Sequence, residues 1–365
     1  MIVALRVDAS IEIGSGHVMR CITLARSLSE VGARCVFISR LLPGNLIGLI
    51  EANGFQCICL PPIDDSAMES ASLTPGGEIQ WLRENWGIDA KQTLLALDKL
   101  EIDWLVVDHY SFDIRWERWV AYPSSRLMVI DDLADRQHYC QILLDQNIGR
   151  TASNYESLVP GGCNILAGSS FALLDRQFER FRSLSLSRRL EGRLEQLLLS
   201  MGGSDQSNMT EKVLRTIYEK KLMTGMQITV IMGPNAPHYQ RVERLASESS
   251  SVTRVLKSVT NMPEIMAESD FAIGAAGTSA LERCSLGLPS AIFSLAENQK
   301  YVADSLLSRH AAVVLKTPND LIGLNRFFGA DTPERNYLQD LSKHSASLVD
   351  GKGVERVLEA FGALH

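Results

Sequence analysis

Short apolar runs and amphipathic stretches alternate along most of this chain. Residues 2–7 form a mostly apolar run rich in β-branched side chains, which predicts a strand followed by a polar turn over 8–12. Apolar positions then recur at the spacing of a helix, at Val18, Ile22, Ala25 and Leu28. Further strands of this half are expected at 34–39, 56–60, 103–107 and 127–130, and helices at 44–53 and 90–100. Strands that alternate with helices favour parallel sheets covered by helices.

The same alternation repeats in the second half of the chain. Strands are expected at 196–200, 227–232, 252–256, 270–273 and 289–293, and helices at 208–218 and 262–268. Between Leu174 and Arg193 the periodic pattern gives way to charged and serine-rich sequence, which is typical of a domain boundary. The length of 365 residues also suits two domains. The sequence therefore predicts an α/β protein of two doubly wound, Rossmann-like parallel-sheet domains, spanning 1–178 and 179–365.

The composition is that of a soluble globular protein, with 45% hydrophobic and 22% charged residues. The net charge of −7 and the lack of clustered Lys and Arg argue against a nucleic-acid partner. No apolar run is long enough to span a membrane, and the chain starts in a strand without a charged and then apolar leader. We therefore expect a cytoplasmic monomer that acts on a small molecule and has no membrane contact.

The spacing of cysteines and histidines predicts neither a metal site nor disulfides. The seven cysteines form no Cys-x-x-Cys pair, and an odd number without an export signal fits reduced thiols. The seven histidines show no His-x-x-x-His or His-Glu-x-x-His spacing. We therefore expect no metal and no cofactor.

A glycine loop joins the first expected strand to the first expected helix. Gly14 and Gly16 allow a tight turn and leave the first N–H groups of the helix uncovered, which favours an anion or a developing negative charge. His17 follows with an imidazole that titrates near neutral pH. The alternative is that the glycines only shape the turn and His17 only caps it, because a two-glycine loop is a weak signal by itself.

Two more glycine-rich loops, Gly202-Gly203 and 274–277, connect strands to helices in the second half. Together their free N–H groups suit a diphosphate, although both could be no more than tight turns. Glu282 follows the second loop at a distance that suits ribose hydroxyls, or it is a solvated helix carboxylate. Neither loop matches a P-loop or a dinucleotide-binding fingerprint, so an ATPase and a dehydrogenase are disfavoured.

Polar residues follow several expected strands of the first half. Ligands bind beyond the carboxyl ends of parallel strands, so these residues are expected along one rim together with His17. Each residue also has an alternative without function. Asp8 could cap a turn, Tyr110 could be a half-buried packing residue, and His109 could form only local hydrogen bonds. Asp131 and Asp132 could be solvated turn residues. The rim residues are Asp8, Tyr110, Asp131 and Asp132.

Taken jointly, these motifs resemble the UDP-sugar hydrolases of pseudaminic acid biosynthesis, which lie in the GT-B superfamily with the glycosyltransferase of lipid II synthesis. The resemblance spans about Met1 to Leu315. It is carried by Asp8, Ile13-Gly14-x-Gly16-His17-x-x-Arg20, Asp108-His109-Tyr110, Met201-Gly202-Gly203-Ser204-Asp205, Gly274 to Ser279 with Glu282, and Glu297-Asn298-Gln299.

The resemblance implies a GT-B fold whose two domains face a cleft. It implies metal-independent hydrolysis of UDP-2,4-diacetamido-2,4,6-trideoxy-β-L-altropyranose to UDP and the free sugar, with inversion at the anomeric carbon. The catalytic residues implied are His17 as base, Tyr110 and Asn298. The substrate contacts implied are Asp8, Gly14, Gly16, Arg20 and Gln299, and the UDP contacts are Gly202, Gly203, Ser204, Gly277, Thr278 and Glu282.

Three other functions stay open on the sequence. A glycosyltransferase would use a sugar acceptor in place of water, and a membrane-associated one needs an apolar and basic patch that is not evident in the first half. A nucleotide-sugar binding protein would have no use for His17 in its glycine loop. A UDP-sugar 2-epimerase of GT-B type is the third alternative.

Overall fold

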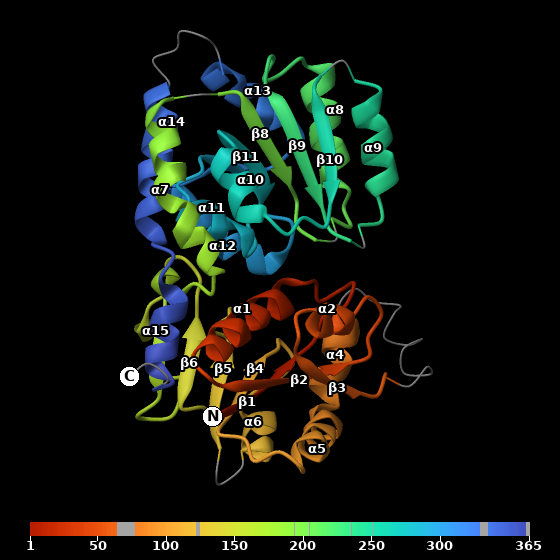
Figure 1. Cartoon of the computed structure of the whole chain (residues 1–365), viewed down its shortest axis with the longest axis vertical. Helices are drawn as coiled ribbons and strands as arrows, with labels where there is room; N and C mark the ends of the chain where they lie inside the picture. Colours follow the sequence, from red (N-terminus) through yellow and green to blue (C-terminus); the bar gives the residue numbers. More distant parts are fainter. Residues whose placement is uncertain are drawn as a thin grey trace. The chain divides into compact units, whose positions relative to one another are not determined.

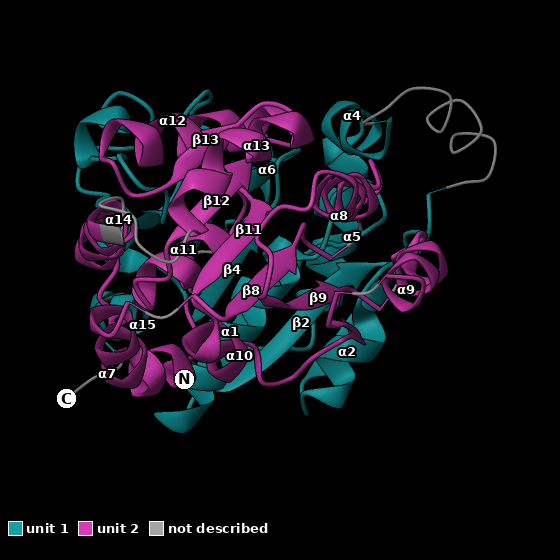
Figure 2. Ribbon diagram, turned by 90° about the horizontal axis from the view of Figure 1, so that it is seen from above, with its two compact units in different colours: residues 1–173, 353–365 teal, residues 174–352 magenta. Residues whose placement is uncertain are grey.

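The computed structural model describes residues 1–63, 77–121, 125–192, 194–203, 205–234, 236–249, 251–328 and 335–362. The chain divides into two compact units, shown in Figure 2. Unit 1 consists of residues 1–173 and 353–365, and unit 2 of residues 174–352. This division differs from the predicted one in two ways. The boundary lies at 173/174, where 178/179 was predicted, and the chain returns to unit 1 at residue 353.

The return to unit 1 is made by helix α15 (Gly353–Ala360). Its apolar residues Val354, Val357 and Leu358 are buried in the same core as strand β1 and helix α1. Phe361 packs on Trp104 with ring centroids 4.7 Å apart. The burial of this apolar face explains why the last helix leaves unit 2.

Unit 1 contains a seven-stranded sheet in which all paired strands run parallel. Its strand order is β3-β2-β1-β4-β5-β6-β7. The strands are β1 (Ile2–Val7), β2 (Arg34–Arg40), β3 (Gln56–Leu60), β4 (Trp104–Asp108), β5 (Arg126–Ile130), β6 (Ile142–Asp145) and β7 (Asn164–Ala167). The other helices of this unit are α1 (Gly16–Glu30), α2 (Ile47–Ala52), α4 (Gly77–Glu84), α5 (Trp86–Leu97) and α6 (Ile114–Val120).

The alternation of side chains along β1 divides the core of unit 1 into two layers. Val3, Leu5 and Val7 pack with α1 and α15, and Ala4 packs on the other side with residues of α5 and α6. Arg6 is fully buried, so this strand places a charge inside the core. That charge is neutralised by neighbouring carboxylates, as described below.

Unit 2 contains a six-stranded sheet, also parallel throughout, in the order β10-β9-β8-β11-β12-β13. The strands are β8 (Gln196–Ser200), β9 (Gln227–Met232), β10 (Thr253–Lys257), β11 (Phe271–Ala275), β12 (Ser290–Phe293) and β13 (Val313–Leu315). Its helices are α7 (Arg176–Leu190), α8 (Met209–Glu219), α9 (Tyr239–Ser247), α10 (Met262–Glu268), α11 (Ser279–Ser285), α12 (Lys300–Ser308), α13 (Leu321–Leu324) and α14 (Arg335–Leu348). Figure 1 shows α9 beside β10, at one edge of this sheet.

The prediction of two doubly wound parallel-sheet domains is confirmed. The sequence did not predict β6, β7 and β13, which are only three or four residues long. No helix separates β5 from β6, so the alternation that marked the other strands is missing there. In each sheet all strands end on the same side, and we call this side the carboxyl edge of the sheet. The candidate site residues lie along the carboxyl edges of the two sheets.

Candidate active site

The loop after β1 presents the start of α1. Gly14 has φ +83°, and its N–H donates to the carbonyl of Ser10 over 2.9 Å. The Ser10 hydroxyl oxygen accepts the N–H groups of Glu12 and Ile13 at 3.1 and 3.0 Å, and the hydroxyl donates to the carboxylate of Glu78. The loop is therefore closed on itself and tied to α4. It delivers the chain to Gly16, where α1 begins.

His17 lies in the first turn of α1 and is 6% exposed. Its Nδ1 is 2.5 Å from Oδ1 of Asp108, the last residue of β4. The guanidinium of Arg20, one helical turn along α1, also contacts both oxygens of Asp108 at 2.6 Å. Asp108 thus fixes the imidazole and the guanidinium together.

The ionisation of Asp108 follows from its surroundings. Burial opposes ionisation of its carboxyl, but Arg20 and His17 outweigh that effect and hold its pKa well below the usual range. The ionised Asp108 at 2.5 Å favours the proton of a neutral His17 on Nδ1, although Arg20 Nη2 also lies 3.2 Å from this nitrogen. In that tautomer the lone pair is on Nε2. His17 is therefore oriented to take a proton at Nε2.

Tyr110 and Asp132 complete the cluster around His17. The ring of Tyr110 meets the imidazole edge-on, with centroids 4.4 Å apart and an interplanar angle of 83°. Its hydroxyl donates to Asp132 over 3.1 Å, and Arg20 Nη1 contacts the same carboxylate at 2.9 Å. The structure therefore brings together the predicted residues His17, Arg20 and Tyr110, and it does so through two aspartates.

Asp8 lies in a different, fully buried network. Arg6 binds its carboxylate with two hydrogen bonds of 2.6 and 2.8 Å, and the backbone N–H of Arg40 donates to it over 2.7 Å. His109 Nε2 is 3.3 Å from it. Although burial raises the pKa of Asp8, Arg6 and His109 bring it well below its ordinary value. Asp8 is 0% exposed, so the structure does not place it with His17 as a group open to a ligand.

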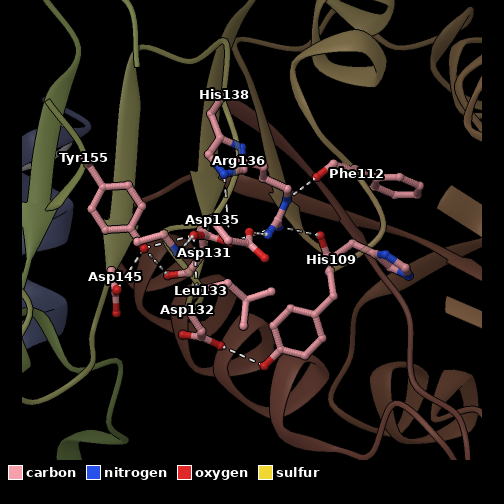
Figure 3. Close-up of polar contacts among 12 residues, drawn as sticks. His109, Phe112, Asp131, Asp132, Leu133, Asp135, Arg136, His138, Asp145 and Tyr155 are labelled. Atoms are coloured by element: carbon pink, nitrogen blue, oxygen red, sulfur yellow. Dashed lines mark hydrogen bonds and ion pairs between the residues drawn. The ribbon is translucent and has the colours of Figure 1, made fainter. Parts of the chain in front are cut away.

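The other aspartates of this edge are shown in Figure 3, where dashed lines join Tyr155 to Asp131 and to Asp145. The Tyr155 hydroxyl is 2.9 Å from Asp131 Oδ2 and 2.8 Å from Asp145 Oδ2. Burial and the nearby Asp132 raise the pKa of Asp145 to about 7. Asp131 is 1% exposed, and Arg136 contacts its carboxylate at 2.9 Å. Asp131 is therefore a buried group that stabilises the carboxyl edge of the sheet.

In unit 2 the loops after β8 and β9 touch through their backbones. A Cβ atom on Gly233 would lie 2.0 Å from the carbonyl oxygen of Gly203, so only glycine fits there. Gly202 has φ +92°. Asp205 closes the loop by accepting the N–H groups of Met209 and Thr210 at 2.8 and 2.9 Å. The predicted UDP contact Ser204 lies outside the described residues.

The loop after β11 contacts the segment that follows β12. A Cβ on Gly277 would be 3.6 Å from Gln299 Nε2, and Gln299 accepts the N–H of Leu295 over 2.9 Å. Thr278 follows Gly277 and immediately precedes α11. Asn298 is exposed on a short 3₁₀ helix over Glu297–Gln299. The structure thus brings Gly277, Thr278 and Gln299 together at the edge of unit 2.

Glu282 lies in α11 and is partly buried. Its burial raises the pKa of its carboxyl to about 7, although Arg283 works in the opposite direction. No hydrogen bond to its carboxylate is formed within the described parts of the chain.

Sequence reasoning missed three residues of these edges and left a fourth open. Asp108 stood in a motif but received no role, although a carboxylate that ends a buried strand at a ligand-binding edge was a usable signal. Gly233 and Arg283 had no signal in the sequence, because only the close approach of two loops reveals them. Asp132 was left open between a rim residue and a solvated turn, and it contacts Arg20 and Tyr110.

Comparison with known proteins shows which families and folds this chain resembles. Residues 197–321 match the model of the glycosyltransferase family 28 C-terminal domain. The chain is 24% identical over 316 residues to the UDP-2,4-diacetamido-2,4,6-trideoxy-β-L-altropyranose hydrolase of Campylobacter jejuni, covering 87% of this chain and 100% of that protein. It is 22% identical over 313 residues to an uncharacterized protein of Methanocaldococcus jannaschii, covering 85% of this chain and 59% of that longer relative.

Among solved structures, the crystal structure of Acinetobacter baumannii MurG superposes with a TM-score of 0.64 and 12% identity. The match covers 100% of this chain and 99% of that one. The fold is of the GT-B type. The resemblance to the UDP-sugar hydrolases that the motifs predicted is confirmed at the level of sequence similarity.

Two further properties follow from the described part of this GT-B chain. None of its helices has both the length and the apolar character needed to cross a bilayer. Within the same residues, no three His, Cys, Asp or Glu side chains gather so that they could hold a metal ion.

Proposed function

We propose that this chain hydrolyses a UDP-linked 2,4-diacetamido-2,4,6-trideoxyhexose to UDP and the free sugar. The observation that carries the proposal is the contact between His17 and Asp108, which leaves Nε2 of a buried imidazole ready to accept a proton. The similarity to the Campylobacter jejuni hydrolase over that protein's full length supports the substrate. The glycosyltransferase discussed below as the alternative would also be an enzyme that acts on a nucleotide sugar.

In the proposed reaction a water molecule attacks the anomeric carbon of the sugar. Its oxygen bonds to that carbon while one of its protons passes to Nε2 of His17. The bond between the anomeric carbon and the glycosidic oxygen breaks, and its electron pair leaves with UDP. Attack opposite the leaving group inverts the anomeric centre, and the proton on His17 then returns to solvent. A positioned base of this kind contributes roughly 10²- to 10⁴-fold to the rate.

We assign the remaining roles as part of the same proposal. Tyr110 packs edge-on against the imidazole and contacts Asp132, so we assign it to the sugar site beside His17. In unit 2 we assign the loops around Gly202 and Gly277 to the diphosphate and Glu282 to the ribose. Asn298 and Gln299 belong to the sugar contacts in this proposal, and Asp8 has a supporting role because it is buried.

A glycosyltransferase is the second candidate. The match to the family 28 C-terminal domain favours it, because that match covers the part of unit 2 that we assign to UDP. The same imidazole would then deprotonate a hydroxyl group of an acceptor in place of water. The hydrolase is preferred because the similarity to the Campylobacter jejuni protein extends through both units.

The test is incubation with UDP-2,4-diacetamido-2,4,6-trideoxy-β-L-altropyranose in the presence and absence of a metal chelator. We expect UDP to be released at equal rates in both, and proton NMR at early times to show the inverted anomer. His17→Asn serves as the inactive control. UDP release that depends on an added sugar or lipid acceptor would replace the hydrolase with the transferase. No release with or without an added acceptor would reject the hydrolase.

A further inference from the structure

Arg283 carries a buried charge beneath the 274–278 loop. It lies in α11 and is 2% exposed, and its side chain turns back towards the start of the helix. Nη2 donates to the carbonyl of Ala275 over 2.7 Å, and Nη1 donates to the Ser279 hydroxyl over 3.1 Å. A Cβ on Gly274 would lie 2.7 Å from Nη1, so glycine there makes room for the guanidinium.

The surroundings of this guanidinium hold little negative charge. Among the described residues no carboxylate lies within ion-pair distance of it, and its Nε has no hydrogen-bond partner. Glu282 and Cys284 are its nearest titratable neighbours on the helix. Burial lowers the pKa of Arg283, and burial also raises the pKa of Glu282 to about 7, which weakens Glu282 as a counter-charge.

Three other deeply buried arginines are paired with carboxylates. Arg6, Arg20 and Arg40 each contact an aspartate at 2.6 Å. Arg189 also has no aspartate contact, and its Nε and Nη1 have no hydrogen-bond partner. Its Nη2 donates to the carbonyls of residues 266 and 267 in the last turn of α10, where the negative end of the helix dipole offsets the charge. A buried charge without a partner is costly to fold, so its presence at one loop points to a negative group that arrives from outside the chain.

We propose that Arg283 is a positioning residue that supplies the buried counter-charge for a diphosphate bound at the 274–278 loop. The guanidinium does not touch the ligand. It fixes the loop through the Ala275 carbonyl and adds a positive potential under it, which grows in effect with the charge of the ligand. This inference rests on the assignment of UDP to unit 2 under the proposed function, and it is independent of whether hydrolysis follows.

The test compares ligands that differ only in phosphate charge. Calorimetric titrations of uridine, UMP and UDP are performed on the wild-type protein and on Arg283→Met. We expect UDP affinity to fall by about tenfold or more, UMP affinity by less, and uridine affinity to stay unchanged, because a charge interaction scales with ligand charge. The matched control is Arg189→Met, which removes another buried guanidinium of unit 2 and is expected to leave the UDP-to-uridine ratio unchanged.

An equal loss for all three ligands would show that Arg283 only shapes the loop, and no loss would show that it plays no part in binding. A wild-type protein that binds none of the ligands would reject both this inference and the proposed UDP site. Graded losses in a protein that does not hydrolyse the sugar nucleotide would support the inference and reject the proposed hydrolase.

Arg283→Lys keeps the test decisive if the methionine variant does not fold. A buried lysine loses its proton at lower pH than an arginine, so its UDP affinity should fall relative to wild type between pH 6 and 9. Glu282 and Cys284 titrate in both proteins, and so does the diphosphate, so the ratio of the two affinities isolates the substituted residue. A ratio that does not change with pH would overturn the proposal.

Discussion

The carboxyl edges of the two parallel sheets handle buried charge in different ways. In unit 1 each buried arginine is paired with aspartates: Arg6 with Asp8, and Arg20 with Asp108. In unit 2 the edge consists of glycine loops in close backbone contact, and Arg283 beneath one of them has no aspartate partner. The same sheet architecture thus carries a neutralised network in one unit and an uncompensated positive charge in the other.

This difference matches the two tasks of the proposed reaction. A base needs a fixed tautomer and orientation, and Asp108 provides both because Arg20 holds it in turn. A leaving diphosphate needs positive potential that is in place before it arrives, because groups that need no reorganisation stabilise developing charge best. Paired charges serve the first task and an unpaired charge serves the second.

The largest expected effect tests the paired side. Asp108→Asn should lower turnover of the sugar nucleotide by roughly 10²- to 10⁴-fold, because an amide at this position no longer enforces the proton on Nδ1 of His17. UDP affinity should stay within about twofold of wild type, because unit 2 is untouched. Steady-state kinetics and calorimetry measure the two quantities. Asp98→Asn, an exposed carboxylate, is the control.

Full turnover in Asp108→Asn with an intact fold would remove the His17–Asp108 contact from the mechanism. A parallel loss of UDP binding would instead mean that the two edges are not independent, and the comparison between them would have to be abandoned.

The second prediction concerns stability. Arg6→Met should lower the free energy of unfolding of unit 1 by about 3–5 kcal/mol, because it leaves buried carboxylates without their main partner. Arg283→Met should change that of unit 2 by less than about 1 kcal/mol, because it strands no carboxylate. All five tryptophans lie between residues 81 and 119, so tryptophan fluorescence in urea reports unit 1. Hydrogen exchange of β11 reports unit 2, and equal losses would contradict the contrast.

A third prediction tests the backbone contact of unit 2. Gly233→Ala should lower the free energy of unfolding by about 1–3 kcal/mol and weaken UDP binding, because the new Cβ forces the carbonyl of Gly203 to move. Gly323→Ala, where a Cβ meets nothing within 4 Å, is the control in the same unit. Thermal unfolding and calorimetry measure the two effects. Unchanged UDP binding would place the site away from the Gly202-Gly203 loop.

The last prediction concerns the pH dependence of unit 1. Burial alone lowers the pKa of His138, but the nearby carboxylates of Asp131 and Glu117 raise it to about 9. A histidine with a raised pKa contributes stability that is complete below about 6.5 and is lost as the pH rises through 9. Unit 1 should therefore lose about 2–3 kcal/mol between these limits, and His138→Gln should flatten that slope. Urea titrations followed by tryptophan fluorescence decide the matter, and an unchanged slope would be the contrary result.

Much of the fold was accessible from the sequence because periodicity is local. The apolar run of β1 and the helical spacing after it were sufficient for the first strand and α1, and the same signal recurred through β12. The short strands β6 and β7 were missed because no helix separates β5 from β6. The return of α15 to unit 1 was missed because its apolar face fits either domain until the two cores are built.

The sequence by itself determined the candidate groups: glycines where strands turn into helices, a histidine at one such turn, and aspartates at strand ends. These are properties of neighbouring residues. Only the tertiary structure decided which of the groups meet. It joined Asp108 to His17 across 91 residues and buried Asp8 under Arg6 and Arg40. It also left Arg283 without a carboxylate, because pairing of charges depends on distances between elements that no local pattern encodes.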